Sequence, residues 1–304
     1  MAFTFWSSSH FKTWIIDPSC DYTIHRLHDV RLLGEENYEK VMIFFSNFIQ
    51  TLGMDVLQSV GKIRMQVIAT AIVYLRRFYS KRSFRDIDPF LLAPTCLYLA
   101  CKSEEHGILH SSKLVLSANN ALRKWPFLNK DIIINMNLIQ EAEFYLLEIM
   151  DCSLIVFHPY RSLVPIIEDA KEFFKEQKDN CPFKDDKEWD SLVAETTKII
   201  NDSYRCDVPL KYAPHQIALG CMLLALINLK KETSFEDYYD AVDTDKEVIG
   251  DVVNELCGMY EIWKNFNEKE ELKKIFEKIP RPNSSRQQYQ SEIHESNSKN
   301  QFTF

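Results

Sequence analysis

The residues with the greatest chemical potential lie together in one short stretch. Glu104, Glu105 and His106 are followed by His110, so two imidazoles stand four residues apart. On a helix this spacing puts both rings on one face, where they could bind a metal ion. The zinc-hydrolase pattern, however, has a glutamate directly after its first histidine, and here that residue is Gly107. Because glycine favours the end of a helix, the stretch is better interpreted as a polar helix end that leads into a loop.

Motifs for phosphate binding and for nucleophilic catalysis are absent from the sequence. There is no GxGxxG or GxxxxGK[ST] stretch, and the 304 residues include only 7 glycines. No serine stands in a GxSxG turn, and none of the 8 cysteines belongs to a CxxC pair. Several cysteines lie in apolar runs, which is typical of reduced core thiols in an intracellular protein. We therefore expect neither a catalytic group nor a cofactor.

The overall charge and the apolar runs exclude two classes of partner. The net charge is −8, whereas a duplex nucleic-acid binder usually carries a positive surplus to contact phosphates. The first residues lack the basic start and long apolar stretch of a secretory signal. The longest apolar run, near 217–227, is too short for a bilayer, which needs about 20 residues. We expect a soluble cytoplasmic or nuclear protein with no direct contact to nucleic acid or membrane.

Two charged residues occupy places where apolar residues would be expected. Glu143 lies on the same predicted helix face as Ile139 and Leu146, and a carboxylate beside an apolar stripe needs a donor. Lys102 follows the apolar run LLAPTCLYLAC. Either residue could be an ordinary surface charge, or the two could face a partner.

An internal repeat helps to position these residues. When the sequence is aligned with itself at a shift of 125 residues, two segments match, and in both of them small residues recur every three to four positions. On a helix this spacing makes one face that a neighbouring helix can approach closely. The matched pairs are Tyr79 and Tyr204, Pro89 and Pro214, Ala93 and Ala218, Cys96 and Cys221, and Ala100 and Ala225. The same shift places Ile227 opposite Lys102, so the copies share a core but differ in charge. This difference favours a partner-facing role for Lys102, because fold-keeping residues should recur in both copies.

Apolar residues spaced at three and four positions predict an all-α fold with two tandem domains of five helices each. We assign residues 1–35 to an N-terminal helix and extension, 36–156 to the first domain and 157–279 to the second. Residues 280–304, rich in Ser, Asn and Gln, should form a disordered tail. The expected helices lie near 7–16, 36–52, 62–81, 89–105, 111–120, 130–151, 160–177, 187–206, 214–230, 235–241 and 246–264.

A proline inside the helix near 89–105 and a basic stretch before it need separate interpretation. Asp88 and Pro89 suit the N-cap and first position of a helix, but Pro94 removes one backbone hydrogen bond, so we expect a kink or a restart there. A basic stretch precedes this helix. It indicates either a solvated helix face, with cations at the last turn, or a docking patch for an acidic or phosphorylated partner. Its members are Arg76, Arg77, Lys81, Arg82 and Arg85.

The run IRMQVIATAIVYLRRFYSKRSFRDIDPFLLAPTCLYLACKSEE, from Ile63 to Glu105, resembles the cyclin box of transcriptional cyclins. The LAxKxEE element of that box appears as Leu99 to Glu105. Glu141–Leu163 resembles the C-type cyclins in particular, as do FWSSSH at the N-terminus, INDSYRCDVPL and MYEIWKNF. The resemblance covers about residues 3–280. It implies two five-helix cyclin boxes with no catalytic site of their own.

The resemblance also implies a partner and the residues that bind it. The partner would be a cyclin-dependent kinase, in a heterodimer, and the kinase-contacting positions of the family fall on Lys102 and Glu143, with Leu99 and Leu147 as apolar contacts beside them. Likeness to the C-type implies the Mediator kinase module, RNA polymerase II transcription and a nuclear location. Trp6 would be a second contact, with the kinase or another module subunit; alternatively, it packs back onto the first box.

The resemblance is incomplete at one surface. Cell-cycle cyclins bind substrate motifs at a patch on their first box helix that contains an Arg and a Trp, and the corresponding stretch here, Val41–Phe48, has neither. Three other interpretations stay open. They are a different transcriptional cyclin, a DNA-binding general transcription factor with cyclin-like repeats, and a helical metal enzyme that uses Glu104, Glu105, His106 and His110.

Overall fold

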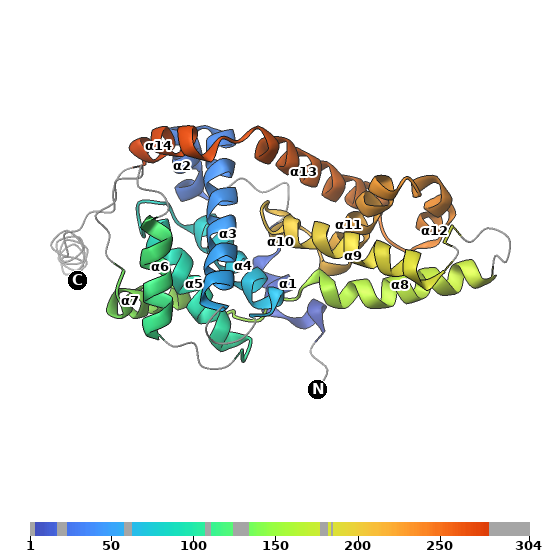
Figure 1. Ribbon diagram of the computed structural model, residues 1–304, viewed down its shortest axis with the longest axis horizontal. Helices are drawn as coiled ribbons and strands as arrows, with labels where there is room; N and C mark the ends of the chain where they lie inside the picture. The colour runs from blue at the N-terminus through green and yellow to red at the C-terminus, as the bar shows by residue number, and fades with distance from the viewer. Residues whose placement is uncertain are drawn as a thin grey trace, which may run out of the picture.

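The computed structural model describes residues 4–16, 23–57, 63–106, 111–123, 134–176, 182–183 and 185–279. Within these segments the chain is helical and contains no strand. Figure 1 shows two groups of helices that lie next to each other along the long axis of the molecule. The predicted disordered tail, 280–304, lies outside the described residues.

The first group follows a short N-terminal region, which has a 3₁₀ turn, η1 (Phe5–Ser7), and two helices, α1 (Ser9–Trp14) and α2 (Ile24–Leu33). Its five helices are α3 (Glu35–Leu57), α4 (Met65–Lys81), α5 (Pro89–Ser103), α6 (Ser111–Arg123) and α7 (Met136–Ile149).

The second group begins with α8 (Pro159–Glu176) and α9 (Asp186–Ser203). It continues with α10 (Val208–Lys211), α11 (Pro214–Leu229), η3 (Glu232–Phe235), α12 (Glu236–Ala241) and α13 (Lys246–Asn265), and α14 (Glu268–Lys278) follows. Two tandem five-helix domains are therefore confirmed, with α8, α9, α11, α12 and α13 as the second set. Three helices were missed: α2, α10 and α14.

The repeat corresponds to equivalent central helices in the two groups. Pro89 begins α5 and Pro214 begins α11, and the Asp88 carboxylate caps α5 by accepting a hydrogen bond from the backbone N–H of Phe90 at 2.9 Å. The repeated small residues are fully buried: Ala93, Cys96 and Ala100 in α5, and Ala218, Cys221 and Ala225 in α11. In each copy the central helix packs against the long helix that precedes it, α4 on α5 and α9 on α11. The expected restart at Pro94 is wrong, because α5 continues through it.

The basic stretch on α4 is mostly not a solvated face. Arg76 and Arg77 are 1% and 0% exposed. The Arg76 guanidinium crosses to the second half, where it donates to the Tyr204 carbonyl at 2.8 Å and to the Asp207 carboxylate at 2.7 Å. Burial alone would raise the pKa of Asp207, but Arg26 and Arg76 outweigh it and lower the pKa to about 2. This part of the basic stretch therefore joins the two halves.

A second link between the halves is His158, in the segment between α7 and α8. Its ring bonds the Thr70 hydroxyl through Nε2 at 2.8 Å and the Tyr204 hydroxyl through Nδ1 at 2.6 Å. Burial, aided by the nearby Arg77 charge, lowers the pKa of His158 to about 3. His10 of α1 is similarly placed: it accepts from the Phe157 N–H at 3.0 Å, and burial lowers its pKa to about 3. Both rings are therefore neutral.

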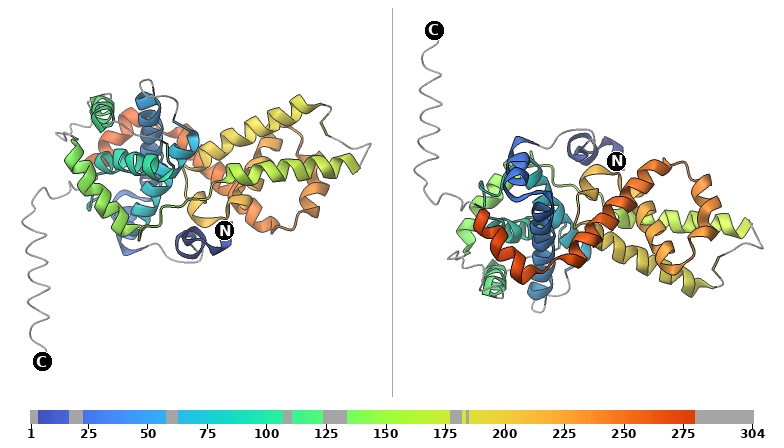
Figure 2. Two further views of the ribbon diagram at one scale, coloured as in Figure 1. Left: turned by 90° about the horizontal axis from the view of Figure 1, so that it is seen from below. Right: turned by 90° about the horizontal axis from the view of Figure 1, so that it is seen from above.

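The last helix, α14, returns to the first half and packs on α2 and α3 (Figure 2). Lys40 of α3 forms an ion pair with Glu271 at 2.6 Å. The Phe276 ring meets those of Phe44, Phe45 and Phe90 at centroid distances of 5.5 to 6.2 Å. The helix was missed because EKEELKKIFEK is mostly charged, and only Leu272 and Ile275 are fully buried. Val41–Phe48 thus lies beneath a segment of the same chain.

We predict that Gly220→Ala lowers the free energy of unfolding by about 1–3 kcal/mol, because α11 and α13 approach too closely for an added methyl group. A Cβ atom at Gly220 would lie 2.6 Å from Cγ1 of Val252. Urea unfolding followed by circular dichroism measures the change. The control is Gly258→Ala on the exposed face of α13, where no atom lies within 4 Å. This substitution should be neutral or stabilising by up to about 1 kcal/mol. Equal effects of the two substitutions would contradict the prediction.

We also predict that His10 and His158 stay neutral in the folded chain from pH 8 to pH 5. The unfolded chain binds a proton at each ring near pH 6.5, and the folded chain does not. Because only the unfolded chain gains protons at these rings, the free energy of unfolding decreases progressively as the pH falls below 6.5 towards 3. Carbon-detected NMR of the ring Cε1 resonances, with the urea-unfolded chain as reference, follows the titration. A folded-state midpoint near 6.5 for either ring would disprove the prediction.

Candidate functional site

Lys102 and Glu143, far apart in the sequence, meet at the surface of the first group. Lys102 stands in the last turn of α5 and Glu143 lies midway along α7, two helices that pack against each other. The Lys102 ammonium forms an ion pair directly with Oε1 of Glu143. The Lys102 side chain is 48% exposed and that of Glu143 only 9%. The donor that the Glu143 carboxylate needs is therefore Lys102, whose own charge still faces solvent.

An aromatic ring completes the surroundings of the ammonium. Tyr98 precedes Lys102 by one helical turn, and its ring centroid lies 4.4 Å from the lysine Nζ. An ammonium at this distance from the face of a ring is attracted by the negative π surface. Sequence reasoning missed this residue because Tyr98 lies inside the apolar run that it had assigned to the core. The i, i+4 spacing of Tyr98 and Lys102 could have revealed it.

The two predicted apolar contacts differ in accessibility. Leu147, one turn after Glu143 on α7, is half-buried and remains partly accessible. Leu99 is only 3% exposed and belongs to the hydrophobic core beneath the pair. The largest exposed apolar side chain beside the pair is instead Phe144, which is 74% exposed and follows Glu143 directly. The sequence pattern did not single it out, because an aromatic residue in an apolar helix suggests core packing.

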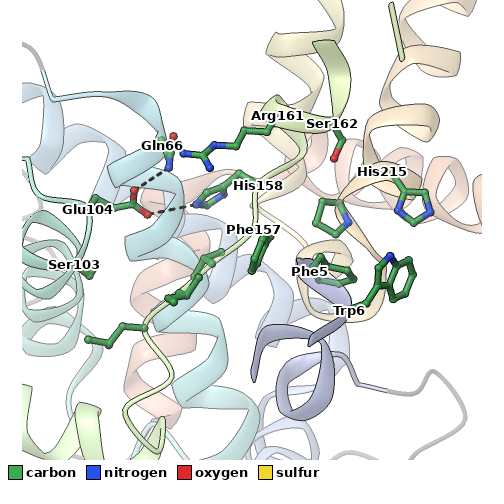
Figure 3. Close-up of a pocket in the computed structure, with 14 residues that line it drawn as sticks. Phe5, Trp6, Gln66, Ser103, Glu104, Phe157, His158, Arg161, Ser162 and His215 are labelled. Atoms are coloured by element: carbon green, nitrogen blue, oxygen red, sulfur yellow. Dashed lines mark hydrogen bonds and ion pairs between the residues drawn. The ribbon is translucent and has the colours of Figure 1, made fainter. Parts of the chain in front are cut away.

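A groove of about 490 Å³ opens between the two halves (Figure 3). It lies beside the segment that connects α7 to α8, with η1 along one edge. Its lining comes from both halves and from the N-terminus: Phe5, Trp6, Gln66, Ser103, Glu104, Leu154, Ile155, Val156, Phe157, His158, Arg161, Ser162, Pro214 and His215.

Trp6 stands on one side of this groove, 55% exposed. Its ring contacts Phe5 and Phe11 at centroid distances of 5.2 and 4.9 Å, and His215 of the second half at 5.8 Å. Half-burial of the His215 ring lowers its pKa. The aromatic side of the groove is therefore held in place by edge-to-face and tilted ring contacts with the N-terminal region and α11, and the Trp6 ring remains exposed.

The opposite side of the groove is polar and contains the acidic stretch that first suggested a metal site. The Glu104 carboxylate accepts hydrogen bonds from Thr70 Oγ1 at 2.7 Å and from Gln66 Nε2 at 2.8 Å. His106 lies in the turn that follows α5, and His110 lies outside the described residues. Among the residues that the structure describes, no group of three His, Cys, Asp or Glu side chains converges on a metal position. Glu104 instead ties α5 to α4.

The cysteines divide into two sets. Cys96, Cys101, Cys206 and Cys221 are buried, and burial raises the pKa of Cys101 and Cys206 to about 12. These four are core thiols, as the apolar runs around Cys96, Cys101 and Cys221 indicated. Cys152 and Cys257 are exposed, which corrects that interpretation for two positions. All six are unpaired thiols.

Known proteins match both halves of the chain in order. Residues 54–155 match the family described as the cyclin N-terminal domain, and residues 158–281 match the cyclin C-terminal domain. Cyclin-C of Drosophila melanogaster is 39% identical over 284 residues, which cover 93% of this chain and 98% of the fly protein. Cyclin-C of Caenorhabditis elegans is also 39% identical, over 289 residues, with 93% and 94% covered.

Solved structures share the fold at lower identity. A chain of the yeast TFIIK complex (Kin28/Ccl1/Tfb3) superimposes with a TM-score of 0.62 at 22% identity, covering 83% of this chain and 100% of that one. A chain of the CAK complex from Chaetomium thermophilum gives 0.66 at 18% identity, with 98% and 96% covered. In the described segments of this chain, every helix is too short or too polar to span a bilayer. With both domain models matched in order and Cyclin-C relatives aligned over nearly its whole length, the chain belongs to the cyclin family.

Proposed function

We propose that the chain is the regulatory subunit of a cyclin-dependent kinase that acts in RNA polymerase II transcription. The observation that supports this most is the Lys102–Glu143 pair, an exposed ammonium held by a nearly buried carboxylate. Family membership adds that cyclins bind and activate such kinases. The 39% identity to Cyclin-C proteins of flies and nematodes favours the kinase of the Mediator complex. The protein would therefore work in the nucleus.

The Lys102–Glu143 pair is suited to bind the C-terminal end of a partner helix. A lysine ammonium has three N–H donors, and the Lys102 side chain is exposed enough to offer them to a partner beside its ion pair with Glu143. The last carbonyls of an α-helix lack partners within the helix and carry the negative end of its dipole, so they attract a cation. The ammonium can therefore bond carbonyl oxygens of the partner, while the Glu143 carboxylate accepts from an N–H. Phe144 and Leu147 would supply apolar contact beside them.

Such a contact can activate the kinase although this chain contributes no catalytic group. A protein kinase transfers phosphate only when its Lys–Glu ion pair and its metal-binding Asp are aligned, and this alignment depends on the position of its regulatory helix. By binding the inward position of that helix more tightly than the outward one, this chain would shift the equilibrium towards the active kinase. The substrates and the catalytic groups belong to the kinase.

The groove beside Trp6 is proposed as a second contact, with the kinase or with another subunit of the Mediator kinase module. Its aromatic side, its polar side at Glu104 and Gln66, and its volume of about 490 Å³ suit a peptide segment that inserts an apolar side chain. This surface is distinct from the α3 face on which cell-cycle cyclins bind substrate motifs. Because α14 covers α3 and the Arg and Trp of that patch are missing, we expect no substrate docking there.

We predict that Lys102→Glu weakens kinase binding by about 2–5 kcal/mol, because it leaves Glu143 without its donor and puts two carboxylates together. In a titration against the Mediator cyclin-dependent kinase of the same organism, Kd should rise at least about 30-fold. The concentration of this chain that half-activates the kinase should rise in parallel.

The matched control is Lys198→Glu on α9 of the second half. Lys198 is likewise exposed and paired with a carboxylate, Glu195, at 3.0 Å. Its reversal should leave Kd and kinase activity unchanged. If Lys102→Glu bound and activated the kinase as the parent chain does, the proposed site would be wrong.

We predict that Trp6→Ala leaves binding to the isolated kinase within about twofold of the parent chain. At the same time it should reduce co-purification with the other subunits of the Mediator kinase module, because the groove loses its exposed aromatic side. Pull-down of the reconstituted module, quantified by mass spectrometry, measures both. Unchanged recovery of those subunits together with weaker kinase binding would assign Trp6 to the kinase instead, and no change in either would exclude Trp6 as a contact.

A further inference from the structure

The Lys102 ammonium is bounded on two sides by its own chain. From α5 the Tyr98 ring lies 4.4 Å from Nζ, and from α7 the Glu143 carboxylate forms the ion pair. Side chains on an α-helix tilt towards its N-terminus, so the lysine stem naturally extends over the residue four positions earlier. Tyr98 is itself half-buried, which fixes the position of its ring.

This arrangement matters because lysine is flexible. Its four-carbon stem has about 2 kcal/mol of rotamer entropy, most of which is lost when the ammonium is fixed in a complex. A carboxylate alone restrains only the charged end of the side chain. A ring beneath the ammonium adds a second restraint and leaves the side that points away from the protein open.

We propose that Tyr98 is a positioning residue that holds the Lys102 ammonium in its binding orientation before the partner arrives. The proposal rests on the function proposed above, since it assigns Tyr98 to the same contact. The ring is the active part of the side chain: among the described residues, none hydrogen-bonds the Tyr98 hydroxyl. Replacement by phenylalanine should therefore preserve the effect.

The internal repeat supports a role outside the common core. The 125-residue shift places Leu223 opposite Tyr98 and Ile227 opposite Lys102. Ile227 is 42% exposed, so the second half presents a plain apolar face at the equivalent turn. The aromatic and the cation are therefore present together only in the copy that carries Glu143, and the core packing of α11 shows that the fold itself requires neither.

The first experiment observes the ring directly, without a partner. The ε-methylene protons of Lys102, assigned by their loss in Lys102→Met, should resonate upfield of those of exposed lysines because of the Tyr98 ring current. The upfield shift should persist in Tyr98→Phe and disappear in Tyr98→Leu. Absence of the upfield shift in the parent chain would overturn the proposal, whether or not the kinase binds.

The second experiment is a double-mutant cycle with the Mediator cyclin-dependent kinase of the same organism. Tyr98→Leu should raise Kd by about two- to fivefold, the range for an exposed cation–π contact, and Tyr98→Phe should match the parent chain. In the Lys102→Met background, Tyr98→Leu should have no further effect. Thermal unfolding of each variant reports any loss of folded protein separately.

The outcomes separate this proposal from the proposed function. If Lys102→Met weakens binding but Tyr98→Leu does not, the kinase contact stands and the positioning role is wrong. If Tyr98→Leu weakens binding equally with and without Lys102, Tyr98 acts through other contacts and the role is again wrong. If Lys102→Met itself leaves Kd unchanged, the proposed function and the positioning role both fail.

Discussion

The close approach of neighbouring helices to α5 is the constraint on which the rest of the first half depends. Ala93, Cys96 and Ala100 have side chains of one or two heavy atoms, so α4 can lie directly against this face. The helix is therefore buried along most of its length, and its most exposed side chain, Lys102, lies in the final turn. Lys102 stands in that turn, where its backbone is fixed by the packing of the preceding turns while its side chain is accessible. The packing of α5 against α7 brings Glu143 within reach.

The second half has the same close packing around its central helix but lacks the charged pair. α11 repeats the buried small residues and the initial proline of α5, yet its last turn carries Ile227 in place of the lysine. The two halves are joined by buried polar contacts rather than by a flexible linker alone. Arg76 bonds the Tyr204 carbonyl and Asp207, while Arg205 reaches back to Asn47 at 2.8 Å and Gln50 at 2.6 Å. Removing one partner from such a buried set is costly, so these contacts restrict movement at the groove.

Most of the helical layout was accessible from the sequence, because it depends on local spacing, whereas the assignment of Lys102 and Glu143 to one contact came from the resemblance to cyclins. Apolar periodicity located the long helices, and the repeat drew attention to Lys102. The rest depends on contacts between distant segments. Arg76 and Arg77 look like surface cations in the sequence, and their burial is explained by partners more than 70 residues away, among them Asp207 and the Ser153 carbonyl. Phe144 cannot be told from a core aromatic by its pattern, and Tyr98 differs from one only by its i, i+4 spacing to Lys102. The helix α14 has too few apolar residues for its pattern to predict that it packs on the first half.

The return of α14 to the first half has a consequence for synthesis of the chain. Phe276 adds its ring to a cluster formed by Phe44, Phe45 and Phe90, and Glu271 neutralises Lys40. All of these partners precede Glu268, the first residue of α14, by 178 residues or more (268 − 90 = 178). The first half therefore emerges early but acquires the apolar cover of α14 last, and the phenylalanines of α3 lack their contact with Phe276 throughout translation of the second half.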